Sequence, residues 1–139
     1  MGMQVSIDIN FAKEYSPKEI LKNLIYSGWE FDYQGSVSYL LPSDIDDYDW
    51  QFIDKNDFDI EEFISSHYDK DKIGIVMIID RISGGNMLIY PDYLSLSLSI
   101  NRHYLSESET IPDFNWYLKR LNIFLNTIKL SSIQCETIY

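Results

Sequence analysis

Hydrophobic and polar residues alternate along several short stretches of the chain, and this alternation predicts strands with one buried face. The clearest case is residues 93–101, where Leu94, Leu96, Leu98 and Ile100 alternate with serine and asparagine. Residues 4–9 alternate in the same way. Weaker strand patterns cover residues 29–33, 36–41, 73–82, 87–90 and 132–139. We expect the strands between residues 73 and 101 to form an antiparallel meander.

The turns of this meander have their own sequence signals. Ser83, Gly84, Gly85 and Asn86 form a run that is typical of a hairpin turn, so we expect one chain reversal there. Pro91 and Asp92 predict the next tight turn.

Three stretches have the spacing of amphipathic helices. Ser16, Pro17 and Glu19 predict an N-cap, a proline at the first helical position and a capping box, and Gly28 is placed to end that helix. A second helix is expected near residues 60–68, capped by Asp57 or Asp59, and a third over residues 113–128.

The resulting order is β-α-β-β-α-β-β-β-α-β. Strands in runs with few helices predict an α+β fold, an antiparallel sheet with about three helices packed against one face. The 139 residues suit one domain over residues 1–139, and no linker or internal repeat divides them.

Composition excludes several classes of protein. The single cysteine, Cys135, excludes an internal disulfide and a multi-cysteine metal centre. Within a terminal strand we expect it to be a small core residue. The longest uncharged apolar run, residues 73–79, is far too short to cross a membrane, and no secretory signal opens the chain. We therefore expect a soluble, cytoplasmic protein without a cofactor.

Catalytic motifs are scarce. Neither a serine nucleophile elbow nor a glycine-rich phosphate loop occurs. Arg102 and His103, with Glu107 and Glu109 nearby, are the candidates for acid–base chemistry, but a polar loop after a strand is the favoured explanation for these residues. We expect the protein not to be an enzyme.

Charge is concentrated in one place. The chain has a net charge of −11, and residues 43–71, called the acidic segment below, carry eleven acidic residues against Lys55 and Lys70. The segment also contains six aromatic residues, which a disordered acidic tail would lack. The expected partner-binding residues are Asp44, Asp46, Asp47, Tyr48, Asp49, Trp50, Asp54, Asp57, Asp59, Glu61 and Glu62.

The acidic segment does not fit a calcium-binding loop. Counted from Asp44, the glycine position of an EF-hand is Asp49 and the final glutamate position is Lys55. We expect no metal site. Nucleic acid is excluded as a partner because the eleven lysines and arginines are spread thinly along the chain. A surface with aspartates and aromatic residues instead favours a basic protein partner.

In size, acidity and fold class, and in the segment Asp44-Ile45-Asp46-Asp47-Tyr48-Asp49-Trp50, the chain resembles the small acidic immunity proteins of bacterial polymorphic or contact-dependent toxin systems. Its isoleucine-rich and alanine-poor composition fits a low-GC bacterial source. The resemblance implies that the protein occludes a cognate toxin domain, often a nuclease, without catalysis of its own. Two alternatives stay open: a general adaptor domain or nucleic-acid mimic, and a small enzyme that uses the Arg102–His103 loop.

Overall fold

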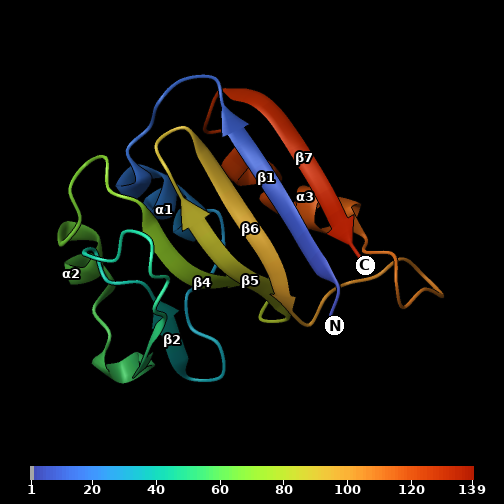
Figure 1. Ribbon diagram of the computed structural model, residues 1–139, viewed down its shortest axis with the longest axis horizontal. Coiled ribbons are helices and arrows are strands. Elements are labelled where there is room, and N and C mark those ends of the chain that lie inside the picture. Colours follow the sequence, from blue (N-terminus) through green and yellow to red (C-terminus); the bar gives the residue numbers. More distant parts are fainter. Residues whose placement is uncertain (1) are drawn as a thin grey trace.

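The computed structural model describes residues 2–139. All seven strands lie in one sheet of order β3-β2-β4-β5-β6-β1-β7, and every neighbouring pair is antiparallel (Figure 1). The elements in chain order are β1 (Gln4–Phe11), α1 (Pro17–Tyr26), β2 (Ser36–Tyr39), β3 (Gln51–Asp54), the 3-10 helix η1 (Lys55–Asp57), α2 (Ile60–Ser65), β4 (Ile73–Ile79), β5 (Ser83–Ile89), β6 (Tyr93–Ile100), α3 (Phe114–Leu125) and β7 (Leu130–Ile138).

The helices α1 and α3 cover one face of the sheet, and the hydrophobic core lies between these two layers (Figure 1). Leu94, Leu96 and Leu98 of β6 are at most 1% exposed on this face, as the period-two pattern predicts. On the other face Ser6 lies opposite Ser97 and Asp8 lies opposite Ser95. The α+β fold class is confirmed.

The turn between β4 and β5 is not where the sequence predicts it. Ser83, Gly84 and Gly85 are buried inside β5, and the chain reverses at Asp80 and Arg81, which adopt φ values of 56° and 58°. Gly85 is needed in the strand because a Cβ there would clash with the carbonyl oxygen of Ser97, where the β5–β6 register shifts.

One further strand prediction is wrong. Residues 29–33 are not a strand, because they form only two isolated bridges, Glu30 to Ile78 of β4 and Tyr33 to Ser36. The strand beside β2 is instead β3, which lies inside the acidic segment and pairs Phe52 with Ser38. The order of strands and helices nevertheless matches the predicted one.

The helix starts are partly as predicted. Ser16 is the N-cap of α1 and Pro17 follows it, but the capping box is wrong because the Ser16 side chain makes no capping hydrogen bond. Asp59 and Asp113 do cap α2 and α3 through their carboxylates.

The C-terminal strand is longer and more exposed than predicted. β7 has nine residues, and Cys135 is exposed, so its prediction as a core residue is wrong. The reason is that β7 is an edge strand. Within residues 2–139 no helix has both the length and the apolar character needed to cross a membrane.

Candidate partner-binding surface

The acidic segment begins with a loop that is organised by one carboxylate. Oδ1 of Asp44 accepts hydrogen bonds from the backbone N–H groups of Asp47 and Tyr48 at 3.1 and 2.9 Å, and Oδ2 accepts one from Asp49 at 2.7 Å. These donors, that of Asp49 above all, lower the pKa of Asp44. The Asp44 carboxylate therefore stabilises the loop and is already engaged in hydrogen bonds within the chain.

Tyr48 attaches this loop to the sheet. Its hydroxyl lies 3.3 Å from the hydroxyl of Tyr90, which follows β5. Lys72, just before β4, places its Nζ atom 4.4 Å from the centre of the Tyr48 ring and donates a hydrogen bond to the carbonyl of Ile45 at 2.6 Å. The loop is thus held in place by one tyrosine and one lysine.

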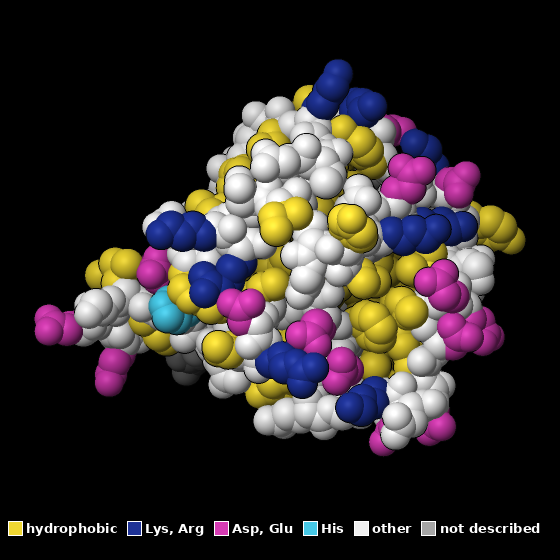
Figure 2. Space-filling view, turned by 180° about the vertical axis from the view of Figure 1, so that it is seen from behind, with side chains coloured by type: hydrophobic (Ala, Val, Ile, Leu, Met, Phe, Trp, Pro, Cys, Tyr) yellow, Lys and Arg dark blue, Asp and Glu magenta, His cyan; other side chains and the backbone are white. Residues whose placement is uncertain are grey.

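An apolar hollow of about 290 Å³ lies next to the loop. Phe58 is one of its lining residues, and its ring centroid lies 5.5 Å from that of Tyr39 and 5.4 Å from that of Phe63. Its lining comprises Tyr39, Leu41, Pro42, Ile53, Asp57, Phe58, Asp59, Glu62, Phe63 and Ser66. Figure 2 shows that hydrophobic side chains gather in a hollowed area on the face of the molecule seen from behind, with acidic side chains beside them.

Two further aspartates of the segment cap the starts of helices. Asp54 accepts a hydrogen bond from the backbone N–H of Asn56 at the start of η1. Asp59 accepts from Glu61 and Glu62 at the start of α2. Such caps satisfy backbone donors that a helix start leaves free.

Six other carboxylates of the segment have no hydrogen-bond or ion-pair partner within residues 2–139, and all are exposed. They belong to Asp46, Asp47, Asp49, Asp57, Glu61 and Glu62. Lys70 pairs with Glu14 at 2.8 Å and lowers the pKa of that carboxyl. Lys55 forms no ion pair within residues 2–139. Within the described residues, no ion pair therefore compensates these six carboxylates.

The structure brings only some of the predicted partner-binding residues together. Asp57, Asp59 and Glu62 share the apolar hollow, whereas residues 44–49 form the separate loop that starts two residues after Pro42. Trp50 directly precedes β3 and is half-buried, and Phe52 of β3 is 74% exposed.

Sequence reasoning missed the hollow itself. Phe58 and Phe63 could be recognised as aromatic residues among acids, but Tyr39 and Ile53 reach the hollow through the pairing of β2 with β3. That pairing has no short-range sequence signal.

The Arg102–His103 loop does not form one cluster of side chains. Arg102 donates hydrogen bonds to the carbonyls of Leu98 and Met3 at 2.7 and 2.6 Å, which tie the end of β6 to the start of β1. The His103 ring stacks on Trp116 of α3 with centroids 4.7 Å apart, and its Nε2 lies 3.9 Å from Asp113. Both side chains are engaged in contacts within the fold.

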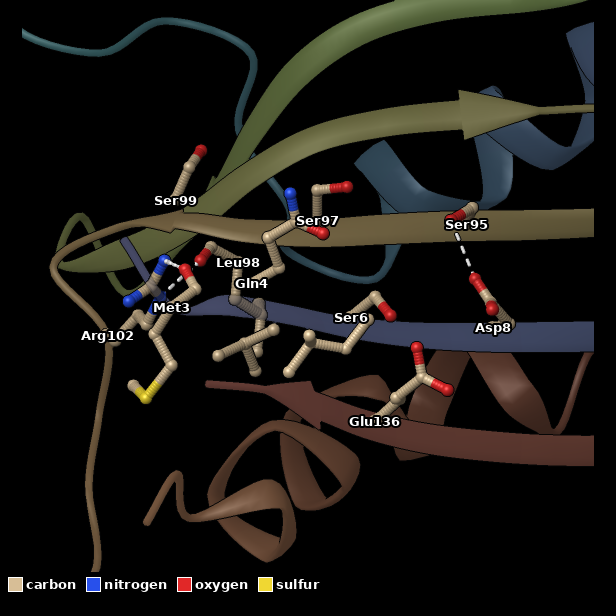
Figure 3. Close-up of a pocket in the computed structure, with 12 residues that line it drawn as sticks. Met3, Gln4, Ser6, Asp8, Ser95, Ser97, Leu98, Ser99, Arg102 and Glu136 are labelled. Atoms are coloured by element: carbon tan, nitrogen blue, oxygen red, sulfur yellow. Dashed lines mark hydrogen bonds between the residues drawn. The ribbon is translucent and has the colours of Figure 1, made fainter. Parts of the chain in front are cut away.

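A larger, polar hollow of about 450 Å³ lies on the open face of the sheet. Figure 3 shows Ser6, Asp8, Ser95, Ser97 and Glu136 on this face, with Arg102 at one end and the hydrogen bond from Ser95 to Asp8. Its lining combines serine hydroxyls, the carboxylates of Asp8 and Glu136, the Arg102 guanidinium and several apolar side chains. In the part of the chain that the structure describes, no three histidine, cysteine or acidic side chains are grouped so that they could hold a metal ion.

Comparison of the chain with protein-family models, with curated proteins and with solved structures found no match.

Proposed function

We propose that this protein is an immunity protein, which binds and occludes a basic toxin domain through the surface of the acidic segment. The observation that carries the proposal is the set of six exposed, unpartnered carboxylates of the acidic segment, two of which, Asp57 and Glu62, line an apolar hollow. Like charges gathered on one surface repel each other, so a cationic partner would relieve a repulsion that the fold itself does not.

The two parts of the surface suit two parts of a basic side chain. The stem of a lysine or arginine is apolar and fits against Phe58 and Tyr39, while its charged head reaches Asp57 or Glu62 at the margin. The loop acids Asp46, Asp47 and Asp49 add long-range attraction that accelerates encounter.

A nuclease is the kind of toxin that this surface would match best. Nucleases bind phosphates with clustered lysine and arginine, and an acidic surface competes with nucleic acid for those groups. In this proposal the chain acts in the cytoplasm and contributes binding alone, and the chemistry belongs to the toxin.

Co-expression tests the proposal. The product of the gene adjacent to this one is expressed in bacteria with and without the protein, and growth is measured. We expect the neighbouring product to arrest growth and the wild-type protein to restore it. Asp57→Lys with Glu62→Lys should abolish the rescue.

A matched control separates the surface from total charge. Glu107→Lys with Glu109→Lys makes the same change in net charge on a loop far along the chain from the acidic segment, and it should rescue as the wild type does. A harmless neighbouring product, or full rescue by the Asp57 and Glu62 variant, would contradict the proposal.

A further inference from the structure

The edge strand β7 is exposed along its whole length. It pairs with β1 on one side only, and within residues 2–139 no other segment pairs with its outer side. Eight of its nine residues are exposed and the ninth, Thr137, is half-buried. A free edge of this length presents a row of unpaired backbone N–H and C=O groups.

The opposite edge of the sheet is short and charged, whereas β7 is long and, apart from one register shift near its start, regular. β3 has only four residues, ends with Asp54 and has Asp49 and Lys55 close to its two ends. Short strands and flanking charges are common devices against edge-to-edge association. β7 contains no proline and no glycine, and Glu136 is its one charged residue.

The sequence of β7 is complementary to itself. When two copies run antiparallel with Gln134 opposite Gln134, Ile133 of each copy lies opposite Cys135 of the other, and Ser132 lies opposite Glu136. Ile133 and Cys135 are paired with Ile9 and Ile7 of β1, so both apolar pairs lie on the core face of the sheet, while Leu130 lies beyond a register shift, opposite Phe11. Leu130, Ile133 and Ile138 are 41%, 37% and 52% exposed in the single chain, so pairing would cover them.

The charges agree with this register. Glu136 lies opposite Ser132 of the other copy, and the two Glu136 residues are separated by about four residues of strand, roughly 13 Å. That separation exceeds the Debye length of about 8 Å at physiological ionic strength, so their repulsion is screened. A register centred on Cys135 would instead place Ile133 opposite Thr137 and Ser132 opposite Ile138.

We propose that two copies of this chain associate through β7, antiparallel and centred on Gln134, to form one continuous sheet. A twofold interface requires a surface that complements itself, and the residue pattern of β7 meets this requirement. Pairing with a strand of an unrelated protein would not require such self-complementarity. The proposal rests on β7 alone and does not depend on the function proposed above.

Molar mass in solution is the first test. Light scattering on the reduced wild-type protein should give twice the 16.4 kDa of the single chain, falling toward 16.4 kDa on dilution. Gln134→Lys should give 16.4 kDa, because two lysines would then face each other at the axis. Within one chain the new lysine lies opposite Asp8, so the variant should keep its fold, which circular dichroism checks.

Ser97→Lys is the matched control. It adds the same charge to the same open face, but on β6, two strands inside the sheet, where the interface does not reach. It should remain a dimer.

Cysteine cross-linking tests the register. In a Cys135→Ser background, Gln134→Cys places two thiols on directly opposed residues, about 5 Å apart between Cα atoms, which suits a disulfide. Ser132→Cys in the same background leaves them roughly 13 Å apart along the strands. Mild oxidation should cross-link the first variant and not the second.

Three results would overturn the proposal. A wild-type protein that is monomeric at every concentration would leave β7 free for a strand of another protein. A Gln134→Lys variant that stays dimeric would place the interface elsewhere. Faster cross-linking through native Cys135 than through Gln134→Cys would reject the register.

Discussion

Ser16 has the backbone conformation of an N-cap residue, with φ −70° and ψ 126°, and Pro17 follows it at the first helical position. Its hydroxyl is nevertheless buried without a hydrogen-bond partner within residues 2–139. A buried hydroxyl without a partner has lost its bonds to water and gained none in return. Ser16→Ala should therefore leave the free energy of unfolding unchanged or raise it by up to about 1 kcal/mol, measured by chemical denaturation.

Asp113→Ala is the contrasting variant at the start of α3. The Asp113 carboxylate accepts a hydrogen bond from the backbone N–H of Trp116 at 3.2 Å, so its removal should cost about 1 kcal/mol. A loss of similar size for Ser16→Ala would mean that its hydroxyl caps α1 in solution after all.

The helix α2 supplies a pH dependence at the scale of one element. His67, just after it, is 2% exposed, and its Nδ1 lies 2.8 Å from the Phe63 carbonyl, while Nε2 has no partner within residues 2–139. Burial lowers the pKa of His67 below its usual 6.5, and the contact with the Phe63 carbonyl opposes this only partly. The unfolded chain therefore takes up a proton at this residue at a higher pH than the folded chain.

The sign of the effect follows from that difference. Stability should fall as the pH drops below about 6.5, until the pH reaches the lowered pKa of the folded state. Denaturation midpoints measured from about pH 7.5 to about pH 5.5 should decrease for the wild type and change less for His67→Gln. Equal slopes for the two proteins would show that His67 is protonated with little resistance in the folded state.

Also at this scale, the sequence predicted elements where packing and local pattern agree. β6 was predictable because Leu94, Leu96 and Leu98 all point into the core while serines face the other side. Asp59 was predictable as a cap because its carboxylate acts within three residues. In both cases the deciding contacts are either local or repeated along one strand.

The predictions that were wrong, the turn at Gly84 and Gly85 and the missed strand β3, concern elements that long-range contacts determine. Gly84 and Gly85 signal a turn locally, but they are required inside β5, since a Cβ at either one would clash with the backbone of a neighbouring strand. β3 consists of ordinary residues in an acidic stretch and exists because β2 lies beside it. Such long-range contacts leave no trace in a window of a few residues.

At the scale of the whole molecule, the candidate surface also has features that the local sequence predicts and features that depend on long-range contacts. Its charge could be counted directly, because carboxylates on a polar segment stay exposed. The apolar hollow could not be predicted from the sequence, because Tyr39 and Phe58 are distant in sequence and meet only after β2, β3 and α2 have assembled. The structure also divides the acids into structural ones, such as Asp44, and unpartnered ones, such as Asp46.

Trp50 provides a prediction about recognition at this scale. It is half-buried between the acidic loop and β3, so truncation removes contact area without emptying the centre of the core. If it anchors the basic partner, Trp50→Ala should fold and lower the affinity for the neighbouring gene product by about 30-fold or more, which corresponds to about 2 kcal/mol. Calorimetric titration measures the affinity, and thermal denaturation checks the fold.

Trp116→Ala, which truncates a half-buried tryptophan on α3, should leave the affinity unchanged. Retention of wild-type affinity by Trp50→Ala would exclude the anchor, whereas unfolding of that variant would assign Trp50 to the core.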